Sequence, residues 1–125
     1  MKHITLIGTG PGDPALLTRR AAEKIREAQM LIGAQRVVSP YGAEKPVVAC
    51  YKTEEILEAI RRANETDIAV LFSGDIGFHS GARKLLPLLK DYTVELCGGV
   101  SSLQYFCEKL GRPWQDVYAV SLHGQ

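Results

Sequence analysis

Short apolar runs alternate with amphipathic segments along the chain, and this alternation predicts the fold class. The strongest run, residues 67–72, reads Asp-Ile-Ala-Val-Leu-Phe, and such nearly continuous apolar character is typical of a central parallel strand covered on both faces. Other short runs rich in β-branched and apolar residues also predict strands. We expect strands at residues 4–7, 30–32, 47–51, 67–72 and 92–96, and a last extended piece at 117–122.

Apolar residues at helical spacing mark the segments between these runs. Thr18 is suited to cap the first helix and Thr53 the second. A third helix should bury a stripe made of Ala82, Leu85, Leu86 and Leu89, and a fourth follows residue 102. The order of elements predicts an α/β fold: an open, mostly parallel five-stranded sheet with helices on both faces.

Three of the strand-to-helix turns are rich in glycine and small polar residues, at residues 8–14, 73–79 and 98–102. In an open parallel sheet, ligands bind beyond the carboxyl ends of the strands. Glycine lets the backbone approach a ligand closely and offer its N–H groups. We therefore expect the three loops to converge on one edge of the sheet and to form a pocket.

The first loop also raises a nucleotide-binding interpretation, because Gly8-x-Gly10 follows a strand and precedes a helix. The dinucleotide fingerprint needs a third Gly or Ala where this chain has Asp13, and Pro11 and Pro14 interrupt the turn. No Lys-Ser/Thr pair follows the glycines, which excludes a Walker-type phosphate cradle. A nicotinamide-dependent dehydrogenase is thus disfavoured.

Composition narrows the class of protein further. A chain of 125 residues is long enough for one domain, and the 46% hydrophobic and 23% charged fractions are ordinary for a folded globular protein. The formal net charge of +1 lacks the basic excess typical of nucleic-acid binding. We therefore expect no nucleic-acid partner.

Cysteine usage and the apolar runs bear on localisation. The cysteines Cys50, Cys97 and Cys107 form no C-x-x-C pair, so we expect buried thiols, no disulfide framework and no protein-bound metal. No apolar run approaches the ~18 residues of a membrane span, and glycines interrupt the start too early for a signal peptide. These features predict a cytoplasmic protein without a membrane partner.

A longer motif makes the first loop far more specific than its glycine count. The chain contains the intact string Gly8-x-Gly10-Pro11-Gly12-Asp13-Pro14-x-Leu16-Leu17-Thr18. This string resembles the opening signature of the tetrapyrrole methylases, S-adenosylmethionine-dependent enzymes that methylate corrin and sirohaem precursors. Two later segments resemble further motifs of that family, Ser73-Gly74-Asp75 with Phe78 and Gly99-Val100-Ser101-Ser102.

The last residues point to one branch of the family. The ending Val120-Ser121-Leu122-His123-Gly124 is similar to an element of the cobalt-precorrin-7 (C-5) methyltransferases of cobalamin biosynthesis. Ile76 departs from the family pattern, because proline is common at that position. The resemblance nevertheless spans essentially the whole chain.

The resemblance implies a cofactor site at the three loops. S-adenosylmethionine would lie in a cleft between two domains, with Pro11 at its border. The second loop would hold the methionine end and ribose through Ser73, Gly74 and Asp75, and Phe78 would pack on the cofactor. Ser101 and Ser102 would contact it from the third loop. A sulfonium cofactor needs donors, an acceptor carboxylate and apolar walls more than cations, and the loops contain no Lys or Arg.

The resemblance also implies a reaction and an assembly. An electron-rich carbon of a corrinoid tetrapyrrole substrate would attack the cofactor methyl group, which needs close positioning and no nucleophilic side chain; no catalytic residue is assigned. The chain would be the N-terminal half of a two-domain enzyme, without independent catalysis, and the full-length protein a homodimer.

Alternatives remain at this point. The same fold could methylate ribosomal RNA or the diphthamide precursor, or the chain could be a non-catalytic ligand-binding or assembly module. Individual residues also have simpler interpretations. Asp75 could be a turn residue or a helix cap, Ser101 or Ser102 could cap the following helix, and Phe78 could be a core aromatic.

Overall fold

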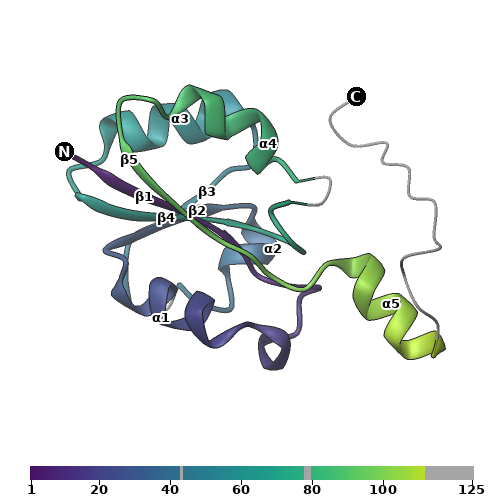
Figure 1. Cartoon of the computed structure of the whole chain (residues 1–125). Coiled ribbons are helices and arrows are strands. Elements are labelled where there is room, and N and C mark those ends of the chain that lie inside the picture. Colours follow the sequence, from purple (N-terminus) through teal and green to yellow (C-terminus); the bar gives the residue numbers. More distant parts are fainter. Residues whose placement is uncertain (43, 78–79, 112–125) are drawn as a thin grey trace.

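Five parallel strands form one sheet in the order β3-β2-β4-β1-β5 (Figure 1). The computed structural model describes residues 1–42, 44–77 and 80–111, without the side chain of Ser102. The strands are β1 (His3–Gly8), β2 (Met30–Gly33), β3 (Val47–Ala49), β4 (Asp67–Phe72) and β5 (Thr93–Cys97). The predicted fold class is confirmed, with the strongest predicted strand, β4, at the centre. The extended piece expected at 117–122 lies outside the described residues.

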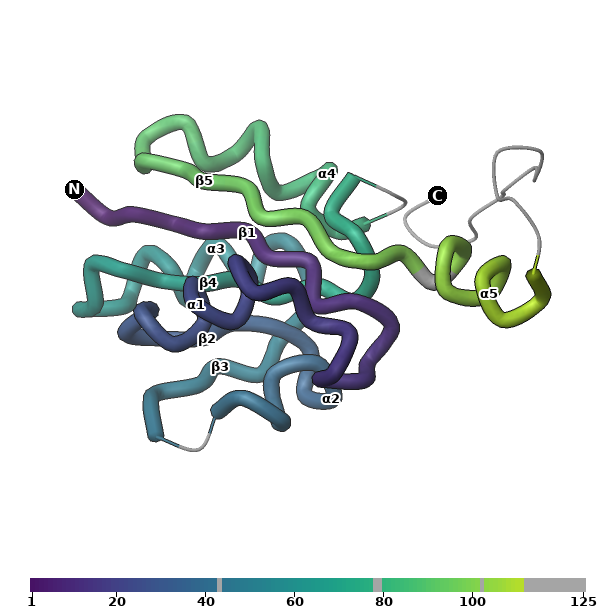
Figure 2. Tube along the Cα trace, turned by 60° about the horizontal axis from the view of Figure 1, so that its bottom comes forward, coloured from purple at the N-terminus to yellow at the C-terminus, as the bar shows by residue number. Residues whose placement is uncertain are grey.

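Helices cover both faces of the sheet. They are α1 (Arg19–Glu27), α2 (Gln35–Val38), α3 (Thr53–Arg62), α4 (Ala82–Leu85) and α5 (Ser102–Leu110), with short 3-10 turns η1 (Pro14–Leu16) and η2 (Leu86–Leu88). The helices α1 and α2 lie on one face, and α3 and α4 lie on the other (Figure 1). The last helix, α5, projects beyond the sheet after β5 (Figures 1 and 2).

Two expected details of the helices need correction. The N-cap of α3 is Lys52, without a side-chain cap, and Thr53 is already helical; the expected cap at Thr18 is confirmed by a 3.1 Å hydrogen bond from the Ala21 N–H. The stripe after β4 excludes Leu86, which is 40% exposed. Pro87 lacks the N–H that would continue the α-helical hydrogen bonds, and α4 passes into the 3-10 turn η2, in which Leu86 is exposed.

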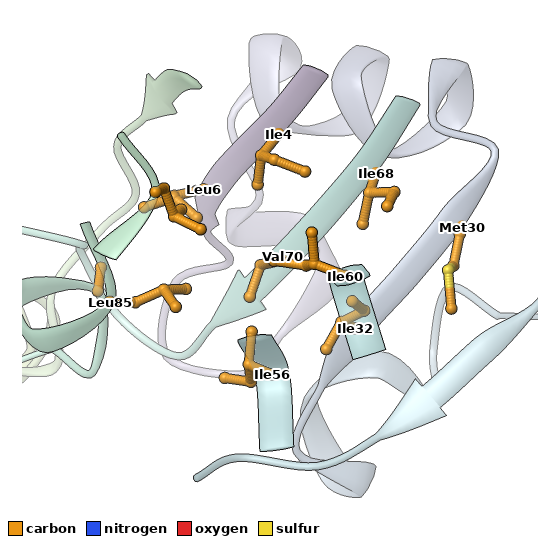
Figure 3. Close-up of a cluster of buried hydrophobic side chains, with 11 residues drawn as sticks. Ile4, Leu6, Met30, Ile32, Ile56, Ile60, Ile68, Val70 and Leu85 are labelled. Carbon is orange, nitrogen blue, oxygen red and sulfur yellow. The ribbon is translucent and has the colours of Figure 1, made fainter. Parts of the chain in front are cut away.

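The core consists of two apolar layers, one on each face. On the face of α3, the β1 and β4 residues Ile4, Leu6, Ile68 and Val70 pack with Ile56 and Ile60 (Figure 3). On the other face, Ile7 and Leu71 pack against Ala21 and Ile25 of α1. Because side chains alternate along a strand, the buried central strands supply both layers at once.

Long polar side chains fasten the helices at the amino edge of the sheet, which is the edge where the parallel strands begin. The Lys45 ammonium donates to the carbonyls of Ile25 and Ala28 at the end of α1, at 2.6 and 2.8 Å. The Lys2 ammonium binds the end of α3 in the same way, donating to Ile60 and, at 2.7 Å, to Ala63. A cation at a helix carboxyl end satisfies free carbonyls and complements the dipole.

An ion-pair cluster ties the edge strand to α1. The Glu95 carboxylate lies 2.9 Å from the Lys24 ammonium and 2.9 Å from the Arg20 guanidinium. Hydrogen bonds from Lys24 and then Arg20 lower the pKa of Glu95 from the ordinary 4.5 to about 2. Since β5 has only one neighbouring strand, this cluster adds a second attachment to it.

The depressed pKa gives Glu95 a defined pH signature. The carboxylate stabilises the fold at pH values above about 4.5, and this contribution is lost as the pH falls toward about 2. We expect Glu95→Gln to lower the urea midpoint at pH 7, and the gap from wild type to close between about pH 5 and pH 2. A gap that stays constant with pH would contradict this, and Glu44→Gln, at an exposed loop position, is the matched control.

Candidate functional site

Three loops meet at the carboxyl edge of the sheet. The first loop (8–14), the second (73–77) and the third (98–101) follow β1, β4 and β5, and β1 lies between the other two strands. The first and second loops pair through their backbones. The Gly10 N–H donates to the Gly74 carbonyl at 3.1 Å, and the Gly74 N–H donates to the Gly10 carbonyl at 2.7 Å. The predicted convergence is confirmed.

Glycine is required at this junction because the three backbones touch. A Cβ on Gly8 would lie 2.6 Å from the Gly74 oxygen, and a Cβ on Gly99 would lie 2.5 Å from the Gly8 oxygen. Real Cβ atoms do not approach an oxygen this closely. Gly10 and Gly74 also have positive φ values, 80° and 70°, which glycine adopts without strain. We call the contact of Gly8, Gly10, Gly74 and Gly99 the loop junction.

Asp75 joins the second loop to the third. One of its carboxylate oxygens, Oδ1, accepts the Gly99 N–H at 3.0 Å. The other, Oδ2, lies toward Gly77, where a Cβ would be 3.2 Å away. The side chain is half-buried. Asp75 therefore has a structural partner within the junction, and its contact with a cofactor stays a prediction.

Ser101 caps α5, as the simpler interpretation of this residue proposed. Its Oγ accepts the Gln104 N–H at 3.1 Å, and the Gln104 side-chain oxygen accepts the Ser101 N–H at 3.0 Å. Such a capping box satisfies two N–H groups that a helix start leaves free. Ser101 is buried, and its hydroxyl oxygen serves as the acceptor that caps α5. The capping box does not use the hydroxyl proton.

The remaining predicted residues are placed less centrally. Pro11 is half-buried beside the junction and Ser73 is exposed. Phe78 and the side chain of Ser102 lie outside the described residues.

Sequence reasoning missed Thr9, a buried residue whose hydroxyl donates to the Phe72 carbonyl at 3.0 Å. Its position directly after β1, between two junction glycines, was the available signal.

Two hollows border the loops. One, of about 660 Å³, is lined by Pro11 and by α5 residues that include Phe106 and Lys109. Phe106 is 62% exposed. The other, of about 480 Å³, lies between α4 and β5 and has mainly apolar walls with Arg83 among them. Both hollows are large enough for part of a small-molecule ligand.

The described residues contain neither a metal-binding cluster nor a membrane-spanning helix. Within residues 1–42, 44–77 and 80–111, no group of three or more His, Cys, Asp or Glu residues could hold a metal ion. In the same part of the chain, no helix is long and apolar enough to cross a membrane. The convergence of the three loops and the hollows beside them make the loop junction the candidate site.

Comparisons with known proteins add an independent observation. The family model for Tetrapyrrole (Corrin/Porphyrin) Methylases matches residues 3–125. A curated relative from Methanocaldococcus jannaschii, "Probable cobalt-precorrin-7 C(5)-methyltransferase", is 30% identical over 98% of this chain and 61% of its own length. The Salmonella typhimurium cobalt-precorrin-7 C(5)-methyltransferase is 29% identical over 98% of this chain and 62% of its own length.

A solved structure shares both fold and sequence. The uroporphyrin-III C-methyl transferase from Thermus thermophilus, complexed with S-adenyl homocysteine, superposes with a TM-score of 0.62. It is 30% identical, and the match covers 81% of this chain and 46% of that chain. The chain thus spans less than two thirds of the curated relatives and about half of this structure.

The loop junction predicts a sharp difference between two glycine substitutions. We expect Gly99→Ala to lower the free energy of unfolding by about 1–3 kcal/mol, because its methyl group would overlap two carbonyl oxygens. Gly81→Ala should cost less. It adds the same atoms at a helical φ of −59°, where the nearest atoms belong to the Phe72 ring at 3.2 Å. Urea unfolding of both variants measures the difference, and equal losses would contradict the proposed contact.

Proposed function

The chain belongs to the tetrapyrrole (corrin/porphyrin) methylase family, and from this premise we propose that it supplies half of an S-adenosylmethionine site for methylating a corrin-ring precursor. The names of the curated relatives support cobalt-precorrin-7 as substrate and C-5 as the methylated position, in cobalamin biosynthesis. The observation that carries the proposal is the convergence of the three family-like loops at one edge of the sheet.

The residues present at the junction fit this cofactor. S-adenosylmethionine offers an amino-acid head, ribose hydroxyls, an adenine and a positively charged sulfonium. The loops offer backbone groups and the exposed hydroxyl of Ser73, and Asp75 holds the third loop at the site through Gly99. None of the loop residues is Lys or Arg. A cation there would repel the sulfonium. The bound complex of the Thermus relative also supports this cofactor.

We assign the binding role to the residues carried over from the family. Pro11 borders the cofactor, the second loop holds its polar end, and the third loop closes around it. The proposed set is Pro11, Ser73, Gly74, Asp75, Phe78, Ser101 and Ser102. When bound, S-adenosylmethionine would supply an activated methyl group, and this chain would orient the reactants and exclude water.

Arg83 is the residue that we propose for the substrate side. Corrin-ring precursors carry carboxylate side chains on a large, mostly apolar ring. The 480 Å³ hollow combines apolar walls with the Arg83 guanidinium, and no ion pair in the described part of the chain involves Arg83. A guanidinium binds a carboxylate through two parallel hydrogen bonds. The hollow therefore suits one edge of such a ring.

We also propose the assembly in which the chain works. Residues 1–125 act as the N-terminal domain of a two-domain, cytoplasmic and homodimeric enzyme, in which the second domain completes the cofactor cleft. The match to less than two thirds of the curated relatives supports this division. So do Phe106 and Leu110 of α5, which are 62% and 55% exposed, because contiguous exposed apolar side chains mark interaction surfaces.

Calorimetry tests the cofactor assignment. We expect S-adenosylhomocysteine to bind the polypeptide extended through the proposed second domain, and the 125-residue chain alone to bind more weakly and to lack methyl transfer. The extended protein should methylate precorrin-7 or its cobalt form, and neither ribosomal RNA nor the diphthamide precursor. Absence of any affinity for S-adenosylhomocysteine in the extended protein would overturn the cofactor assignment.

Steady-state kinetics of the polypeptide extended through the proposed second domain test the substrate side. We expect Arg83→Ala to raise the KM for the corrin-ring substrate about tenfold while the affinity for S-adenosylhomocysteine stays unchanged. Lys84→Ala is the matched control, because Lys84 is the next residue of α4 and does not line the hollow. Equal effects of the two substitutions on KM would contradict the role of Arg83.

A further inference from the structure

We propose that Asp75 is a positioning residue that serves the cofactor site by holding the third loop through Gly99. The inference deepens the proposed function, on which it rests for what the third loop binds. Its physical basis is independent of that function, because it is the 3.0 Å hydrogen bond from the Gly99 N–H to the Asp75 carboxylate.

The backbone of Asp75 has a fixed place relative to the first loop. It directly follows Gly74, whose N–H and C=O are both bonded to Gly10. From this anchored point the side chain crosses to the third loop, where a Cβ on Gly98 would lie 3.0 Å from Oδ1. Within the described residues, this is the one side-chain hydrogen bond that joins the second loop to the third.

Gly99 depends on this acceptor. The carbonyl oxygens of Gly8 and Gly74 crowd its α-carbon, at 2.5 and 2.6 Å from the position of a Cβ. Its N–H is partly buried and is bonded to Asp75. A partly buried N–H without an acceptor is costly, so loss of the carboxylate oxygen would favour movement of Gly99 away from the junction.

The position of Gly99 then determines the start of α5. Two residues later, Ser101 begins the capping box of that helix. Because α5 projects beyond the sheet (Figures 1 and 2), its direction depends mainly on the third loop. Pro11 and α5 together line the 660 Å³ hollow. Asp75 thus influences the shape of this hollow through its bond to Gly99.

Amide hydrogen exchange of the 125-residue chain tests the contact. Asp75→Asn keeps an acceptor oxygen at the same distance, whereas Asp75→Ser is too short to reach Gly99 yet suits a turn. We expect exchange at Gly99 to accelerate at least about tenfold in Asp75→Ser and less than about threefold in Asp75→Asn. The Gly74 amide, bonded to Gly10, should keep its wild-type rate in both variants.

The control variant is Asp91→Asn, at an exposed carboxylate near the amino end of β5, and it should leave every junction amide unchanged. An unchanged Gly99 rate in Asp75→Ser would overturn the proposal. Equal acceleration at Gly74 and Gly99 would overturn it as well, because that pattern indicates general destabilisation instead of release of one loop.

Binding of S-adenosylhomocysteine by the polypeptide extended through the proposed second domain provides the functional readout. We expect Asp75→Asn to keep the wild-type affinity within about threefold and Asp75→Ser to lose at least about tenfold. Equal losses in both variants would show that the carboxylate charge contacts the ligand directly, and would overturn the positioning role. A wild-type extended polypeptide without affinity would count against the proposed function, while the exchange rates would still decide the role of Asp75.

Discussion

The contact of three glycine backbones is the constraint on which the carboxyl edge of this sheet depends. Gly8 and Gly99 lie too close to the neighbouring backbones, that of Gly74 included, to carry a side chain, so the loops after β1, β4 and β5 meet at one point. Asp75 and the paired Gly10 and Gly74 backbones hold that position by hydrogen bonds. A ligand that meets one loop therefore meets a surface to which all three contribute.

The two edges of the sheet have different roles. At the amino edge, Lys2 and Lys45 bind the ends of α3 and α1, and in the middle of β5 Glu95 binds Lys24 of α1. The polar groups there bind one another and stabilise the layers. At the carboxyl edge, glycine backbones and two hollows remain beside the junction. This division leaves one edge of a stable sheet for binding, as is general for open parallel sheets.

Local patterns predicted the strands and the convergence of the loops, because strand periodicity and glycine-rich turns are local signals. They did not predict that α4 would pass into η2 at Pro87 and leave Leu86 exposed, or that Asp75 would bind Gly99. The latter contact depends on the strand order, which places β1 between β4 and β5. The family resemblance marked Asp75 as important, and only the fold gave it a partner.

Nuclear magnetic resonance offers the most direct test of the claim that the loop junction forms the cofactor edge. The isotope-labelled chain would be titrated with S-adenosylhomocysteine while its backbone amides are followed. The largest shifts are predicted at Gly10, Gly74 and Gly99, with the amino-edge amides of Thr66 and Thr93 unchanged. Shifts confined to the amino edge, or unaffected loop amides at saturation of binding, would contradict it.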